Sequence, residues 1–159
     1  MNGHSPNAWE GSRVMVIGSM GLIGGFIAEA SLECGHPTYL LIRPELASLS
    51  KASTIKSLQD RGATTIYGSI KDQDVMEKVI REHKIENVIS AVGGASIADQ
   101  VKLVNAIKVA GTVKVINVCY SRVCYLTSYN GQILHLKSME TRKRRYQTVI
   151  PTLTFAATP

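Results

Sequence analysis

The stretch of sequence that decides the fold is RVMVIGSMGLIG, which spans residues 13–24. It begins with a short, mostly apolar run that ends at Gly18, as a buried strand commonly does. Apolar residues then recur at helical spacing from Leu22 until the pattern stops at Gly35. A strand, a turn with three glycines and a helix in this order are typical of the start of a dinucleotide-binding βαβ unit.

The same alternation of strand and helix continues as far as residue 118. Further strands are predicted at residues 38–42, 64–67, 87–92 and 112–118. Further helices are predicted at residues 53–61, from Asp72 onward, and at 97–110. The strands are nearly continuous apolar runs, as expected where helices cover both faces of a parallel sheet. The predicted fold is therefore α/β: a Rossmann-like, doubly wound parallel sheet, truncated, with an irregular C-terminal tail.

The distribution of charge predicts three parts of different character. Up to Val118 the chain carries 12 lysines and arginines against 11 acidic residues, and after it 6 against 1. We expect a flexible N-terminal segment (1–12), an NAD(P)-binding Rossmann-like domain (13–118) and a divergent basic tail (119–159). The basic run at 142–145 has no basic helix or aromatic platform beside it, so a solvated tail is favoured over a nucleic-acid, membrane or import-receptor contact.

Composition excludes several classes of protein. No apolar run approaches the roughly 20 residues that span a bilayer, and residues 1–13 lack the apolar stretch of a secretory signal. Three cysteines, Cys34, Cys119 and Cys124, are too few for a disulfide framework and fit a reducing compartment. We expect a soluble cytoplasmic protein with no membrane partner.

The glycine-rich turn predicts a phosphate-binding loop. Glycine permits the tight bend, lets the backbone approach a pyrophosphate and allows the helix to pack closely on the strand, while the helix N-terminus favours anions. The spacing is G-x-x-G-x-x-G, and a plain turn is the alternative interpretation. The predicted cofactor-binding residues of this turn are Gly18, Ser19, Met20, Gly21, Leu22, Ile23 and Gly24.

The end of the second strand favours NADPH over NADH. An acidic residue at this place binds the ribose hydroxyl of NAD, whereas an arginine suits the 2′-phosphate of NADP. Here Arg43 ends the strand, Glu45 follows only after Pro44, and Lys51 offers a second positive charge. Ordinary surface charges are the alternative for Arg43 and Lys51. The glycine-containing segment 90–96 either passes near the cofactor or forms a flexible turn.

Catalytic and metal-binding residues cannot be assigned from spacing. Tyr67 and Lys71 have the four-residue separation of a reductase pair, but they follow a strand, so we interpret the spacing as coincidence. His135 lies between leucines and is predicted to be structural, and Cys34 is predicted to lie in the core. No cysteine or histidine spacing predicts a metal site.

The first 114 residues resemble the plant leucoanthocyanidin reductases, in the isoflavone-reductase-like branch of the NmrA-like atypical short-chain reductases. The resemblance rests on residues 13–24, 28–32, 35–44, 66–68, 89–96 and 106–114. It implies NADPH bound by the glycine loop, Arg43 and Lys51. It also implies hydride transfer that converts a flavan-3,4-diol to a flavan-3-ol in flavonoid and proanthocyanidin biosynthesis, so the implied partner is a small-molecule flavonoid.

Two departures from this family bear on function. Ser19-Met20 stands where the family usually has Ala-Thr, and after Lys114 the segment that leads to the family's catalytic lysine is replaced. The catalytic residues are therefore unknown. Three hypotheses remain: an NADPH-dependent reductase that keeps cofactor binding, a non-catalytic NADP-binding NmrA-like module, and a truncated or frame-altered product without activity.

Overall fold

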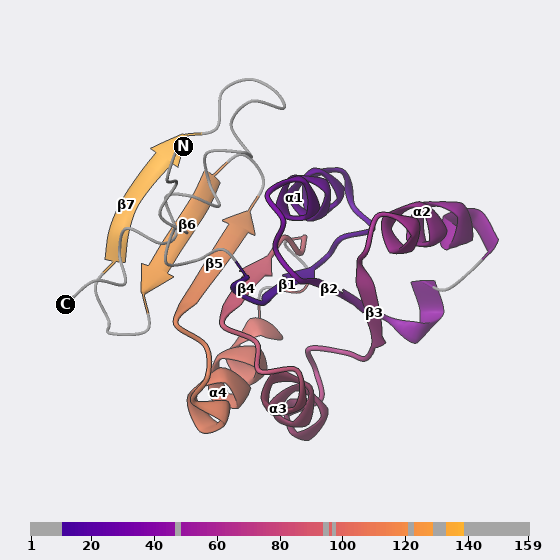
Figure 1. Cartoon of the computed structure of the whole chain (residues 1–159). Coiled ribbons are helices and arrows are strands. Elements are labelled where there is room, and N and C mark those ends of the chain that lie inside the picture. Colours follow the sequence, from indigo (N-terminus) through magenta and orange to yellow (C-terminus); the bar gives the residue numbers. More distant parts are fainter. Residues whose placement is uncertain are drawn as a thin grey trace, which may run out of the picture.

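The computed structural model describes residues 11–46, 49–93, 96, 98–120, 123–128 and 133–138. Strands and helices alternate through most of this range and are coloured along the chain in Figure 1. The strands are β1 (Val14–Ile17), β2 (Thr38–Ile42), β3 (Thr64–Tyr67), β4 (Asn87–Ser90), β5 (Val115–Tyr120), β6 (Val123–Ser128) and β7 (Ile133–Ser138). The helices are α1 (Leu22–Glu33), the 3₁₀ turn η1 (Pro44–Leu46), α2 (Leu49–Asp60), α3 (Gln73–Glu82) and α4 (Gln100–Ala110).

The strands form one seven-stranded sheet in the order β3-β2-β1-β4-β5-β6-β7. Its first five strands are parallel, which confirms the predicted Rossmann-like α/β fold. The first strand lies between β2 and β4, so the chain reverses its direction of travel across the sheet at this position. In open α/β sheets of this kind, ligands bind at the carboxyl ends of the strands where the order reverses.

Helices cover both faces of the parallel strands. Figure 1 shows α1 and α2 on one face and α3 and α4 on the other. Because successive residues of a strand point to opposite faces, β1 contributes Val14 and Val16 to the core under α1 and α2, and Met15 and Ile17 to the core under α3 and α4. All four side chains are buried, which explains why the strand has no polar position.

The sheet continues beyond the fifth strand, into the segment for which an irregular tail was expected. Strand β6 pairs antiparallel with β5, and β7 pairs antiparallel with β6. Six-residue strands with β-branched or aromatic residues suit this pairing, and only two residues separate β5 from β6. The division of the chain at residues 12 and 118 stays a prediction. Residues 1–10 and the basic run at 142–145 lie outside the described residues.

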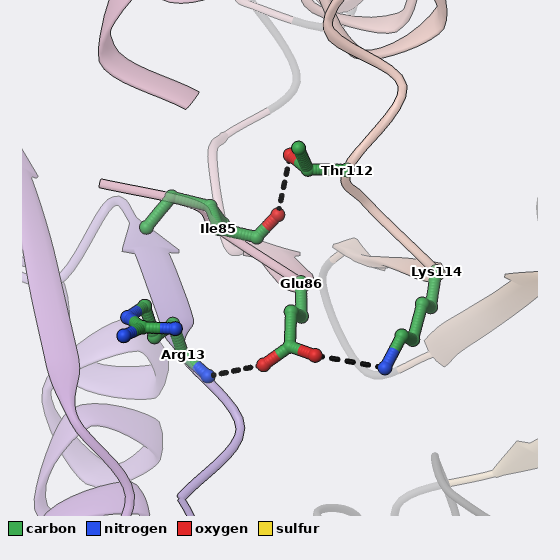
Figure 2. Close-up of polar contacts among 5 residues, drawn as sticks. All are labelled: Arg13, Ile85, Glu86, Thr112 and Lys114. Carbon is green, nitrogen blue, oxygen red and sulfur yellow. Dashed lines mark hydrogen bonds and ion pairs between the residues drawn. The ribbon is translucent and has the colours of Figure 1, made fainter. Parts of the chain in front are cut away.

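One carboxylate joins three segments at the amino ends of the strands (Figure 2). Glu86 Oε2 accepts a hydrogen bond from the Arg13 backbone nitrogen at 3.2 Å, and Glu86 Oε1 lies 2.8 Å from Lys114 Nζ. Next to this group, Thr112 Oγ1 donates to the Ile85 carbonyl oxygen at 2.9 Å. Partial burial raises the pKa of Glu86, but the hydrogen bonds from Lys114 and Arg13 outweigh it, so the pKa is below its ordinary value.

None of the described helices has the length and apolar character needed to cross a membrane.

Candidate functional site

The glycine loop lies between the end of β1 and the start of α1, at the carboxyl edge of the sheet. Gly18 has φ +83°, a left-handed conformation that glycine adopts without strain. A Cβ atom on Gly18 would lie 2.5 Å from the Ala91 carbonyl oxygen, and one on Gly24 would lie 2.0 Å from the Gly18 carbonyl oxygen. The backbone of the loop therefore packs against both α1 and the segment after β4, at distances that only glycine allows.

The middle glycine closes the turn and starts the helix. The Gly21 nitrogen donates to the Gly18 carbonyl oxygen at 3.0 Å, and Gly21 is the N-cap residue of α1. Because glycine has no side chain, no side-chain cap accepts a hydrogen bond from the first amides of the helix. These amides, with the positive end of the helix dipole, suit an anionic group such as a phosphate.

The other loop residues contribute in different ways. Ser19 is buried, and its Oγ has no hydrogen-bond partner among the described residues. Met20 and Ile23 are partly buried and pack against the core under α1 and α2, whereas Leu22 is 78% exposed. The polar groups that the loop can offer to a ligand are therefore mainly those of its backbone.

Lys51 contacts the loop directly, although it lies 31 residues further along the chain. Its Nζ on α2 donates a hydrogen bond to the Met20 carbonyl oxygen at 3.1 Å. Arg43 is exposed and directly follows β2, which is the neighbour of β1 in the sheet. The structure thus brings Lys51 to the loop and leaves Arg43 on the same edge of the sheet, without a described contact between the two.

The carboxyl end of β4 forms the opposite side of the loop. Ala91 supplies the carbonyl oxygen that Gly18 approaches, and its nitrogen donates to the Ile17 carbonyl oxygen at 2.8 Å. Ser90 is fully buried at the end of the strand, and its Oγ lacks a partner in the described part of the chain. Segment 90–96 therefore begins beside the glycine loop, although residues 94 and 95 lie outside the described residues.

Two buried polar residues near this edge were not singled out from the sequence. Gln100, the first residue of α4, and Asn117, in β5, each hold a buried side-chain oxygen without a partner among the described residues. Asn117 interrupts the apolar strand sequence VINVCY, a signal that was available. Gln100 stands at a helix start, where polar residues are common, so its sequence gives no such signal.

The other residues considered for catalysis lie away from the loop or have ordinary roles. Tyr67 ends β3 and Lys71 lies between β3 and α3, so neither belongs to a helical pair, and Lys71 Nζ is 3.8 Å from Asp99 Oδ2. A further titratable residue, His36, precedes β2 at the opposite edge from the loop, and burial lowers its pKa despite a backbone hydrogen bond with Ser12.

The prediction that Cys34 lies in the core is wrong. Cys34 is the C-cap residue of α1 and is exposed, because the buried face of the helix ends with Ser31. Its thiol has a pKa above the ordinary value, first because of partial burial and second because of the neighbouring Glu33 carboxylate. His135 and the other two cysteines lie in β5, β6 and β7.

Comparison with known proteins agrees with this fold. A leucoanthocyanidin reductase of Desmodium uncinatum is 52% identical over 103 residues, which are 65% of this chain and 27% of that protein. A phenylcoumaran benzylic ether reductase of Ginkgo biloba is 43% identical over 104 residues, 65% of this chain and 33% of that protein. The solved binary complex of leucoanthocyanidin reductase with NADPH from Vitis vinifera gives a TM-score of 0.64 at 50% identity, over 66% of this chain and 35% of that one.

The similarity to these reductases covers about a third of their length. A longer part of the chain, residues 10–144, matches the NmrA-like family. This match includes the glycine loop, the four helices that flank the parallel strands, and the antiparallel strands that follow. The chain therefore belongs to the NmrA-like family.

Proposed function

We propose that this chain binds NADPH at the glycine loop and is related in function to the leucoanthocyanidin reductases. The observation that carries the proposal is the hydrogen bond from Lys51 Nζ to the Met20 carbonyl oxygen, which places an ammonium group on the rim of the loop. Binding of a pyrophosphate is supported by the close-packed glycines and by the uncapped start of α1.

The choice of NADPH over NADH follows from the charges on this edge. Arg43 stands where an NAD-binding protein would carry an acidic residue, and Lys51 adds a second positive charge on the same side of β1. The exposed Glu45 lies in η1, beyond Pro44, rather than at the end of β2. The 2′-phosphate of NADPH would then bind to Arg43 and Lys51, and the pyrophosphate to residues 18–24.

The activity implied by the resemblance is reduction of a flavan-3,4-diol. Bound NADPH would supply a hydride to C4 of the substrate, and the 4-hydroxyl would leave with one proton as water, giving a flavan-3-ol and NADP⁺. Within the described residues, we assign no side chain to the proton transfer. The proposal for the described residues is therefore limited to binding of the cofactor.

A non-catalytic NADP-binding module is the second candidate. It is supported by the described residues themselves, since the close-packed glycine loop and Lys51 offer a cofactor site. Both candidates need the same cofactor site, and they differ only in turnover. The third possibility, a truncated or frame-altered product without activity, requires neither.

The first experiment is a titration of the purified chain with NADPH and with NADH, followed by nicotinamide fluorescence. We expect tighter binding of NADPH, and we expect Arg43→Ala and Lys51→Met each to reduce the preference for NADPH by about tenfold, the effect of losing one charge-assisted hydrogen bond. Lys56→Ala is the matched control, because Lys56 is exposed on the same helix as Lys51 and is not part of the site.

The outcomes separate the three hypotheses and test the roles given to Arg43 and Lys51. If NADPH binds, turnover of a flavan-3,4-diol by the same preparation distinguishes a reductase from a binding module. If both nucleotides bind equally and the variants change nothing, the assignment of Arg43 and Lys51 is wrong. If neither nucleotide binds to folded protein, both functional candidates fail and a product without activity is left.

A further inference from the structure

One peptide unit of the glycine loop is held at both of its ends. The Met20 carbonyl oxygen accepts a hydrogen bond from Lys51 Nζ at 3.1 Å. The Gly21 nitrogen, at the other end of the same unit, donates to the Gly18 carbonyl oxygen at 3.0 Å. Because a peptide unit is planar, hydrogen bonds at both ends fix the orientation of its plane. Lys51 and Gly18 therefore determine together how the backbone enters α1.

The backbone at Gly21 does little by itself to keep this peptide unit in place. Gly21 has φ −87°, and glycine adopts positive and negative φ about equally well, so rotation of the unit meets little steric resistance. Rotation would break the hydrogen bond from Gly21 to Gly18, which closes the turn in front of α1. The hydrogen bond from Lys51 to Met20 opposes this rotation.

Helix α2 is anchored so that Lys51 can reach the loop. Ile55 and Leu58 are buried in the core under α1 and α2, and Met20 and Ile23 pack against the same core. Further along α2 from Lys51, an open hollow of about 260 Å³ lies between the two helices, lined by Gly25, Glu29, Ser53, Thr54, Ser57 and Leu58. Because side chains leave this space open, a hydrogen bond adds a connection that packing does not provide here.

The ammonium group of Lys51 also offsets an unfavourable charge on the rim of the loop. A backbone carbonyl oxygen carries partial negative charge, so an unpaired Met20 carbonyl would repel the pyrophosphate of a nucleotide. The Lys51 ammonium lies 3.1 Å from this oxygen and offsets its charge. An ammonium has three N–H donors, so one can stay on Met20 while the other two are available to phosphate oxygens.

We propose that Lys51 is a positioning residue for the glycine loop, in addition to its contact with the 2′-phosphate. Its hydrogen bond holds the Met20–Gly21 peptide unit in the orientation that leaves the first amides of α1 open to a pyrophosphate. This inference rests on the proposed cofactor site and gives Lys51 a role there that Arg43 does not share. Loss of Lys51 should therefore weaken every nucleotide that carries a pyrophosphate, whereas loss of Arg43 should act mainly on nucleotides with a 2′-phosphate.

The first measurement is amide hydrogen exchange of the full chain without nucleotide, read by mass spectrometry in peptides that cover residues 18–24. Lys51→Met keeps a long, flexible side chain but removes the donor. We expect the loop amides of this variant to exchange about tenfold faster, the effect of losing one charge-assisted hydrogen bond, while β2 exchanges at the wild-type rate. Lys51→Arg keeps a donor and should restore slow exchange.

The second measurement is the dissociation constant of ADP, which carries a pyrophosphate but neither a 2′-phosphate nor a nicotinamide. Isothermal titration calorimetry should show that Lys51→Met weakens ADP binding by about tenfold, a larger loss than that of Arg43→Ala. Lys51→Arg should regain most of the affinity. Lys56→Met is the matched control, because Lys56 is exposed on the same helix, and it should equal the wild type in both measurements.

Two results would overturn this role of Lys51. In the first, Lys51→Met leaves the exchange of residues 18–24 unchanged; in the second, Lys51→Met and Arg43→Ala weaken ADP binding equally. Failure of the proposed function gives a different result, in which the folded wild-type chain binds neither NADPH nor ADP. The exchange measurement needs no nucleotide, so in that case it alone decides: faster exchange in Lys51→Met supports the positioning role, and unchanged exchange overturns it.

Discussion

At the scale of single residues, Gly24 is the position of the loop where a side chain is least tolerated. A methyl group there would lie 2.0 Å from the Gly18 carbonyl oxygen, which is backbone and cannot move as a flexible side chain can. We expect Gly24→Ala to lower the free energy of unfolding by about 1–3 kcal/mol, the usual cost of overpacking, and to weaken NADPH binding. Urea unfolding and the fluorescence titration measure the two effects.

The neighbouring Gly25 provides the control for this substitution. A Cβ atom on Gly25 would lie 3.4 Å from the Ser19 carbonyl oxygen, a much milder contact, and alanine favours the helical conformation there. Gly25→Ala should change stability by no more than about 1 kcal/mol in either direction. Equal losses in the two variants would mean that the close approach of Gly24 to Gly18 does not set the shape of the loop.

The sequence predicted the glycine loop and missed part of what surrounds it. The spacing of Gly18, Gly21 and Gly24 is a local pattern, so it can be recognised without a structure. The contact between Lys51 and the Met20 carbonyl oxygen depends on how α2 lies against the loop. No local pattern encodes such a contact, and Lys51 was selected only as a nearby positive charge and through the resemblance.

At the scale of elements, α3 depends on a single cap. Asp72 is its N-cap residue, and Asp72 Oδ1 accepts a hydrogen bond from the Val75 nitrogen at 3.2 Å. We expect Asp72→Ala to lower the free energy of unfolding by about 1 kcal/mol, because the amide loses its partner. Asp72→Ser should keep most of the stability, since serine also caps helices. If alanine and serine were equally harmful in urea unfolding, the cap would not be the cause.

The bounds of the elements were predicted with unequal success. Strand β2 was predicted with the bounds that the structure has, because each of its residues adds to a sheet covered on both faces. Helix α2 begins at Leu49, four residues before the predicted start, because its core residues Ile55 and Leu58 lie in the later turns. Strands β6 and β7 are defined by pairing with β5, which no local pattern in residues 119–138 reveals.

At the scale of the whole molecule, low pH should destabilise the fold by protonating Glu86. Its carboxylate links the residues that directly precede β1, β4 and β5 (Figure 2). The pKa of Glu86 is lowered in the folded chain, so as the pH falls the unfolded chain takes up the proton first. The stabilisation is therefore complete above about pH 5. It is lost as the pH falls through the ordinary glutamate range near ~4.3 toward the lower pKa of the folded state.

We expect Glu86→Gln to be less stable than the wild type at pH 7 by about 1 kcal/mol, a modest value because the carboxylate is partly exposed. The difference should shrink as the pH falls from 6 to 3.5, measured by urea unfolding at each pH. Glu33→Gln is the control, since Glu33 pairs with Arg61 at the exposed end of α1. Parallel curves for wild type and Glu86→Gln would exclude this role for Glu86.

The order of the strands has a consequence for synthesis on the ribosome. Of the described strands, β1 is translated first, yet it lies between β2 and β4 in the sheet. Its first neighbour is complete at Ile42, and its second only at Ser90. At about 5–20 residues per second, roughly 2–10 s pass between these two points, during which β1 can pair with β2 alone and its β4-facing edge is unpaired. Chaperone protection of that edge should matter most during this interval.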